Sequence, residues 1–161
     1  MLQSLVAEFS FRFPLPVEIL LLRTLGAAFL CGLIGLERGV HKNPAGLRTN
    51  MLVGLAVSTF CMITIYMMAT LDTGNAALRF DPIRRVEAVT AGITFLAAGV
   101  IVFTKGDVKG LTTGASVWLS EAIGLACGLG IWSVALMASR AGVAILWLLR
   151  QRQYATGLKD E

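Results

Sequence analysis

The sequence predicts an all-α membrane protein, a bundle of about five transmembrane helices. Hydrophobic residues make up 56% of the 161 residues, charged residues make up 15%, and the mean hydropathy is +0.74. Soluble domains have about 25% charged residues, and a soluble domain of this length could not bury so much apolar surface. The apolar segments that approach the ~20 residues needed to cross a bilayer are Val17–Leu36, Met51–Leu71, Val86–Thr104, Thr112–Gly130 and Ile131–Leu149.

We expect one membrane domain over residues 1–150 and a short polar cytosolic tail over residues 151–161. The residues before the first span lack the basic and then apolar pattern of a cleaved signal peptide, so we interpret them as a lead-in segment. Cys31, Cys61 and Cys127 lie inside spans without metal-ligand spacing. They predict neither a disulfide framework nor a zinc site.

Small residues recur along three of the spans. In the first and fourth spans they stand four apart, which places them on one helix face and lets helix backbones approach closely. We expect these stripes to pack helices within the chain, and a dimer seam or a pathway lining is the alternative. The residues are Ala27, Cys31, Gly35 and Gly39, then Ser116, Ser120, Gly124 and Gly128, with Ala91, Gly92, Ala97, Ala98 and Gly99 in the third span.

The loops between the spans are short and carry helix-start signals. In "DPIRR", Asp81 precedes Pro82 and is expected to cap the third span. The loop "KGDVKG" predicts a tight turn. It leads into "GLTTG", where Thr112 or Thr113 is the expected N-cap of the fourth span.

Basic residues at the span ends predict the orientation, because cytosolic loops carry an excess of Lys and Arg. With the N-terminus outside and the C-terminus cytosolic, eight basic residues lie inside and four outside. The net charge of +4 therefore reports topology and does not indicate nucleic-acid binding. The inside residues are Arg38, Lys42, Arg48, Lys105, Lys109, Arg150, Arg152 and Lys159, and the outside residues are Arg12, Arg79, Arg84 and Arg85.

This orientation brings the first and third loops to one face, where the second and fourth helices begin. Helix N-termini carry partial positive charge and free N–H groups, and Arg48 and Lys109 add full charges. The face is therefore a candidate site for an anion, an acidic lipid or an acidic partner segment. The alternative is that these residues only anchor and cap the helices.

Three charged residues fall within spans: Arg23, Glu121 and Arg140. Glu121 lies nine residues from each end of its span, and Arg140 lies nine residues into the fifth span. Both are then roughly 13 Å below the outer edge. Because a charge at mid-bilayer costs at least ~2.5 kcal/mol, we expect a buried Glu121–Arg140 ion pair that Arg23 can join. A role in moving protons or cations is the alternative.

Enzymatic chemistry is not indicated. The single histidine, His41, has no Ser, Cys or Asp placed for a triad, and no phosphate-binding glycine loop occurs. Magnesium prefers oxygen ligands, and no two carboxylates have ligand-like spacing, so whether a metal binds stays unknown. No cofactor is expected.

Three segments occur in order: "GLIGLERGVHKNPAGLRTNMLVGLAV", "DPIRRVEAVTAGITFLAAGVIV" and "VKGLTTGASVWLSEAIGLACGLG". Together they resemble the membrane domain of the MgtC/SapB family of bacterial inner-membrane proteins, from about Val17 to Arg150. The resemblance implies a cytosolic-face motif and an outer-loop motif. The first comprises Glu37, Arg38, Arg48, Thr49, Asn50, Lys109, Thr112 and Thr113, and the second comprises Asp81 and Arg84. Between the motif ends, Val40–Asn43 is expected to be a linker in which His41 and Lys42 tolerate substitution.

The resemblance also implies a function. A multi-pass protein of the bacterial inner membrane is expected, without enzymatic activity, that serves adaptation to low magnesium, acid and host stress, including virulence. It would regulate another membrane complex, such as the F-type ATP synthase. The lipid bilayer is expected to surround it, and a homodimer is also expected. The alternative is a small oligomeric cation or proton channel or transporter related to magnesium transport.

This chain differs from the family pattern in two places that matter here. The family usually has a small residue where Glu121 stands and an apolar one where Arg140 stands, and because both departures occur at one predicted depth they further support the pair. Many members also continue into a soluble ACT-like domain after the fifth span, whereas this sequence ends at Glu161.

Overall fold

The computed structural model describes residues 13–39, 45–71, 82–104 and 107–156. Within these ranges the chain forms five helices and one antiparallel hairpin, so the all-helical prediction is confirmed except at the hairpin. The elements are α2 (Val17–Gly39), α3 (Leu47–Leu71), α4 (Pro82–Gly99), β1 (Val102–Thr104), β2 (Asp107–Lys109), α5 (Leu111–Leu129) and α6 (Trp132–Thr156).

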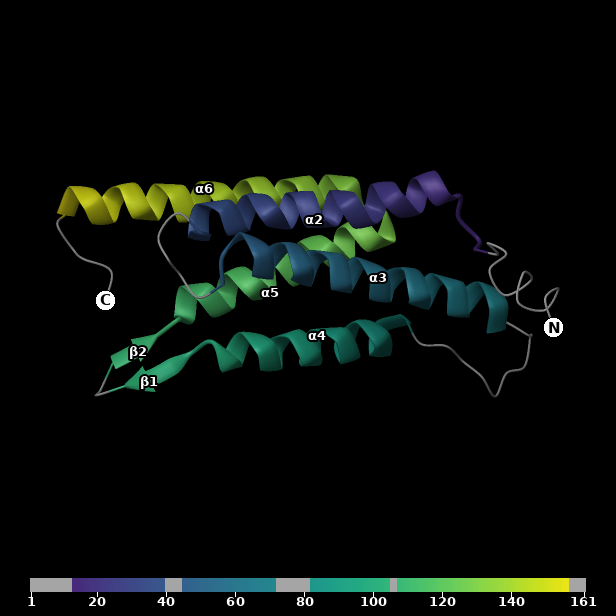
Figure 1. Ribbon diagram of the computed structural model, residues 1–161, viewed down its shortest axis with the longest axis horizontal. Coiled ribbons are helices and arrows are strands. Elements are labelled where there is room, and N and C mark those ends of the chain that lie inside the picture. Colours follow the sequence, from purple (N-terminus) through teal and green to yellow (C-terminus); the bar gives the residue numbers. More distant parts are fainter. Residues whose placement is uncertain (1–12, 40–44, 72–81, 105–106, 157–161) are drawn as a thin grey trace.

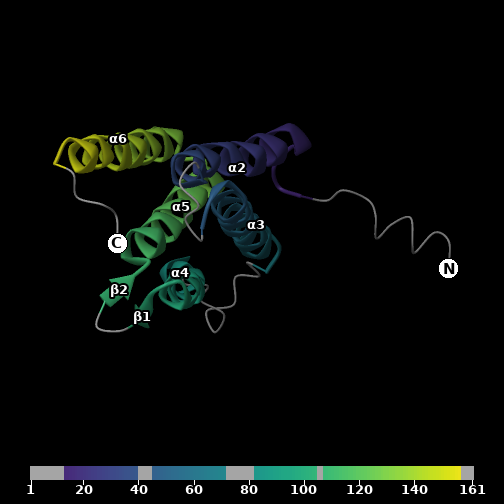
Figure 2. The same cartoon turned by 60° about the vertical axis from the view of Figure 1, so that its left-hand side comes forward.

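The helices lie along one long axis in three layers (Figure 1). Helices α6 and α2 form one side, α4 forms the other, and α3 and α5 lie between them, as the turned view also shows (Figure 2). Consecutive helices run in opposite directions. The end of α2, the start of α3, the hairpin and the start of α5 therefore share one end of the bundle, here called the hairpin end. This confirms that the elements on either side of the first and third loops meet at the same end of the bundle.

Helices α2 and α3 are long and apolar enough to cross a membrane, over Val17–Arg38 and Leu47–Thr70. Only 39% and 33% of these stretches are buried, whereas the core helix of a soluble protein is mostly buried. Elsewhere in the described ranges the apolar parts are shorter, Val86–Gly99 and Trp132–Leu148. Large apolar side chains face outward on several helices, including Phe95, which is 83% exposed. These features are those expected of membrane helices.

The third predicted span is wrong at its end, whereas the predicted tight turn agrees with the strand register, because Thr104 pairs with Asp107. The helix stops at Gly99, and Val102–Thr104 pairs with Asp107–Lys109 as an antiparallel hairpin. The apolar sequence continues past the helix end with Val and Phe, which suit strands as well as helices. A hydropathy pattern therefore could not detect the change.

The predicted threonine N-cap of α5 is also wrong. The helix begins at Leu111 after Gly110, whose φ is +88°, and no side chain caps it. A Cβ atom at Gly110 would lie 2.2 Å from the carbonyl oxygen of Val100. Only glycine fits this left-handed conformation and close approach. Thr113 is thus available for another contact, described below.

The small residues of the first and fourth spans pack α2, α3 and α5 together, as expected. A Cβ atom added at Gly35 would lie 2.6 Å from Leu47 Cα, and one at Gly54 would lie 2.4 Å from Cys31 Sγ. On α5, a Cβ atom at Gly124 would lie 2.9 Å from the carbonyl oxygen of Gly54. Close packing of this kind drives association between membrane helices.

Two apolar clusters form the core on either side of α5. One joins α2, α5 and α6 and includes Cys31 and Cys127, and the other joins α3, α4 and α5. The three cysteines are free and buried. Of the third-span small residues only Ala97 is buried, and nothing lies within 4 Å of a Cβ atom added at Gly92 or Gly99.

Some predictions fall outside the described residues. These concern the linker Val40–Asn43, with His41 and Lys42, and Asp81 of the outer-loop motif. Helix α6 continues to Thr156, so the predicted boundary at residue 150 falls within it.

Candidate functional site

A buried hydrogen bond joins the end of α2 to the start of α5. Arg38, in the last turn of α2, is only 8% exposed, and its Nη2 donates to Oγ1 of Thr113. Ser116 Oγ donates to the carbonyl oxygen of Thr113 over 2.8 Å. A buried guanidinium is stable only with such partners. Arg38 therefore fixes the end of α2 against the first turn of α5.

A second buried contact centres on Asn50, which is fully buried in the first turn of α3. Its Nδ2 donates to the carbonyl oxygens of Gly46, over 2.9 Å, and Ala45, over 3.2 Å. Its Oδ1 accepts a 2.8 Å hydrogen bond from Ser120 Oγ on α5. The carbonyl oxygen of Ser120 in turn accepts from Cys31 Sγ on α2 over 3.2 Å. Asn50 thus uses both its donors and its acceptor, and three helices meet at Ser120.

We call Arg38, Asn50, Thr113, Ser116 and Ser120 the polar seam. Three of these, Arg38, Asn50 and Thr113, belong to the predicted cytosolic-face motif, and the structure brings them to the contacts between α2, α3 and α5. Ser116 and Ser120 were interpreted only as small packing residues. Two features of the sequence could have indicated their polar role. Ser116 and Ser120 stand four residues apart, and Ser116 follows Thr113 by three residues.

The other members of the motif lie outside the seam. Arg48, Lys109 and Thr112 are exposed, and Glu37 and Thr49 are half-buried. The two exposed basic side chains remain at the hairpin end, where α3 and α5 begin. The motif is therefore divided into a buried part that holds helices together and an exposed basic part.

Arg23 binds at the opposite end of the bundle. Its Nη1 donates to the carbonyl oxygen of Gly128 over 2.9 Å, in the last turn of α5. The guanidinium packs against Gly130, where a Cβ atom would lie 2.5 Å from Nη2. A cation at a helix C-terminus is favoured by the helix dipole. Arg23 therefore serves the end of α5, and in the described part of the chain it joins no ion pair that includes Glu121 or Arg140.

The predicted Glu121–Arg140 pair is wrong. Glu121 is 3% exposed, Arg140 is exposed, and no ion pair joins them among the residues that the structure describes. The two residues do stand at the same level, because each lies eight positions from the α5–α6 connection, counted from Leu129 and Trp132. The rotations differ.

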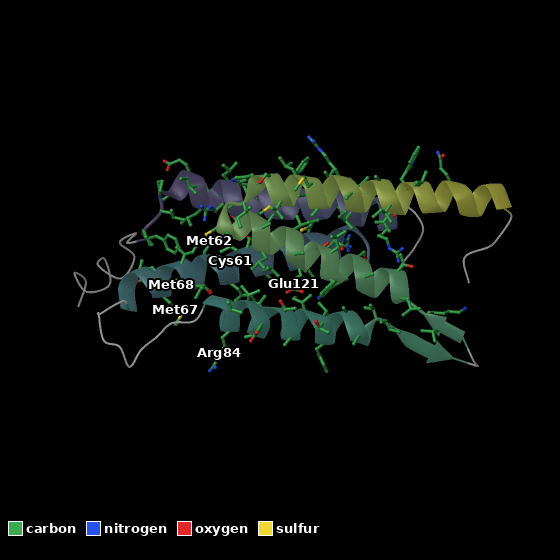
Figure 3. All side chains as sticks on the ribbon, turned by 180° about the vertical axis from the view of Figure 1, so that it is seen from behind. Cys61, Met62, Met67, Met68, Arg84 and Glu121 are labelled. Atoms are coloured by element: carbon green, nitrogen blue, oxygen red, sulfur yellow. The ribbon has the colours of Figure 1, made fainter. Side chains whose placement is uncertain are left out.

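Helix α6 packs on α2 and α5 through a face that includes Ala135 and Ser139, and Ser139 Oγ donates to Leu30 O over 3.3 Å. Arg140, the next residue, points roughly 100° away from Ser139. Glu121 instead lies between α5 and α4, on the opposite side of α5 (Figure 3). Its Oε2 is buried without a hydrogen-bond partner.

The MgtC family model matches residues 25–154. The chain belongs to the MgtC family. It is similar to "Protein MgtC" of Brucella abortus strain 2308, with 39% identity over 125 residues that cover 78% of this chain and 49% of that protein. It is also similar to "Putative magnesium transporter YhiD" of Escherichia coli K12, with 33% identity over 132 residues that cover 81% of this chain and 60% of that protein.

The chain thus spans 49% to 60% of the length of these curated relatives. No solved structure matches it. Within this MgtC-family chain the first and third motif segments meet at the polar seam. Arg38 and Asn50 come from the first segment, and Thr113 comes from the third.

Proposed function

We propose that this MgtC-family chain is a non-enzymatic, multi-pass inner-membrane protein that regulates another membrane complex, such as the F-type ATP synthase, during low-magnesium, acid or host stress. One relative bears the name of a magnesium transporter, which supports a link with magnesium. Arg38, Arg48 and Lys109 at the hairpin end support an orientation with that end in the cytosol and the N-terminus outside.

The outward position of Arg140 carries this proposal. The residue is exposed eight positions into α6, roughly 12 Å from the helix start. A charged side chain near mid-bilayer costs about 2.5–3.5 kcal/mol on insertion scales. In the described part of the chain no acidic side chain forms an ion pair with it. An acidic group on a partner helix at the same depth would remove that cost.

The surface around Arg140 suits a helix contact. Met137, Ala144 and Trp147 are exposed at positions three or four residues apart from it or from each other, so they share its face of α6. Apolar and small side chains flank one cation. This arrangement combines close packing with one polar contact, the two features that hold membrane helices together.

The test is photo-crosslinking in cells that produce the protein with benzoylphenylalanine at Ala144. We expect a crosslink to one membrane protein that has an acidic residue at matching depth. Arg140→Leu should lower its yield at least about tenfold, equivalent to 1.4 kcal/mol. The matched control Arg48→Leu, which removes an exposed arginine at the hairpin end, should leave the yield unchanged. Equal yields with and without Arg140 would contradict the proposal.

A small oligomeric cation or proton channel is the second candidate, and the unpartnered carboxyl of Glu121 favours it. Against it, Arg38 is bonded to Thr113 and Asn50 to Ser120, so these buried polar side chains serve contacts between helices. Purified protein in liposomes should show no cation or proton flux if the regulatory function holds. A flux that Glu121→Gln abolishes would reverse the ranking of the two functions.

A further inference from the structure

A cavity of about 250 Å³ lies between α3, α4 and α5, in the half of the bundle away from the hairpin. Its walls are almost wholly apolar and include Phe60 and Met68 of α3, Ile83 and Val89 of α4, and Leu125 of α5. It is partly open to the surroundings of the bundle. Concave apolar surfaces of this kind bind small molecules when a few polar groups converge on them.

Glu121 stands beyond the inner end of this cavity. It lies one helical turn, about 6 Å, from Leu125 toward the hairpin end, on the same face of α5. Val117, a turn further, belongs to the apolar cluster of α3, α4 and α5. Figure 3 shows the Glu121 side chain between α5 and α4, on the hairpin side of Cys61. Glu121 does not line the cavity itself, but it lies on the same face of α5 between Leu125, which does, and Val117.

No cation of the described chain satisfies this carboxyl. Arg23 is bonded to Gly128, Arg140 is exposed on α6, and Arg84 is exposed on α4. Glu121 Oε2 has no hydrogen-bond partner although the residue is only 3% exposed. A buried carboxylate without a partner is costly, and an added donor or cation would remove the cost.

The surroundings restrict what this added group can be. Magnesium keeps several waters and takes oxygen ligands in octahedral geometry, which an apolar cavity beside a single carboxyl does not supply. The described residues contain no group of three His, Cys, Asp or Glu that could hold a metal. A hydrocarbon chain fits the walls, and an amine nitrogen complements the carboxyl. We propose that the cavity binds a lipid-soluble amine, with its chain between α3, α4 and α5 and its nitrogen on Glu121.

The experiment uses the full chain in phosphatidylcholine nanodiscs and an octylamine that carries a diazirine on its chain. After photolysis, mass spectrometry locates the label. We expect label on the cavity residues of α3, α4 and α5. The alcohol with the same diazirine-bearing chain should give at least about tenfold less label there, as should Glu121→Gln with the amine.

Two further variants make the result specific. Glu87→Gln applies the same change to an exposed glutamate of α4 and should label like the unaltered protein. Val89→Phe fills the cavity while Glu121 stays in place, and should lose the label even if Glu121→Gln does not fold. The proposal is overturned by three results: no label at the cavity, equal label in Glu121→Gln, or equal label from the alcohol. None of these readouts involves Arg140, so they do not depend on the regulatory function.

Discussion

Replacing Asn50 with alanine tests whether the polar seam holds α3 and α5 together. The substitution removes two hydrogen bonds to the carbonyls before α3 and one from Ser120. A hydrogen bond contributes about 0.5–1.5 kcal/mol in proteins generally, and polar pairs between membrane helices average about 0.6 kcal/mol. Because Asn50 and Ser120 are fully buried, we expect Asn50→Ala to lower the free energy of unfolding by about 2–3 kcal/mol.

A double-mutant cycle separates the contact between helices from the bonds within α3. Ser120→Ala alone should cost about 1 kcal/mol. The double variant should cost less than the two single effects together, by about 0.6–1 kcal/mol, because the contact can be lost only once. Unfolding in mixed dodecylmaltoside and dodecyl sulfate micelles, followed by circular dichroism, measures each free energy.

Thr59 provides the matched control for this cycle. It is exposed on α3, and its hydroxyl donates only to Leu55 O of its own helix, over 2.8 Å. Thr59→Ala should change the free energy of unfolding by less than about 0.5 kcal/mol. Effects of Asn50→Ala and Ser120→Ala that add within about 0.3 kcal/mol would refute the idea that this bond couples the two helices.

Two glycine predictions use the same unfolding assay. Gly54→Ala should destabilise the protein by about 1–3 kcal/mol through overpacking against α2, whereas Gly92→Ala, which meets open space, should be neutral or stabilising. If the two variants have the same free energy of unfolding, the close contact at Gly54 does not restrict the size of the residue there. Gly110→Ala should cost about 1–2 kcal/mol for the left-handed backbone alone, with the nearby carbonyl adding to it, and Gly99→Ala serves as its open control at the same end. A Gly110→Ala protein as stable as the original would show that this turn can rearrange.

The sequence could predict the helices because hydropathy shows how many consecutive residues can be placed in an apolar medium. The same property hid the end of α4. Residues Val100–Thr104 continue the apolar run, and a short apolar run fits a helix or a strand. The pairing of Val102 with Lys109 depends on a contact between two segments, which no single-segment pattern contains.

The motif residues were predicted better than their contacts. Arg38, Asn50 and Thr113 could be selected from the first and third segments, but their spacing does not say which side chains meet. Thr113 looked like a helix cap because of its position, and it instead accepts a hydrogen bond from Arg38. The rotation of each helix about its axis decides such pairs, and it is set by packing at glycines such as Gly35 and Gly54.

Glu121 and Arg140 allow a test of whether helix rotation decides which side chains meet. An ion pair would couple them, so that Arg140→Leu would partly rescue Glu121→Ala. The structure places them on opposite sides of α5, and we expect their effects to add within about 0.3–0.5 kcal/mol. Glu121→Leu should raise the free energy of unfolding, since it replaces a buried carboxyl whose Oε2 has no hydrogen-bond partner. Cycles measured for both substitutions at Glu121, with Arg140→Leu as the second change, decide between the two arrangements. A coupling of 1 kcal/mol or more, about fivefold in the unfolding equilibrium, would show that Glu121 and Arg140 do form an ion pair. That result would contradict the helix rotations described above.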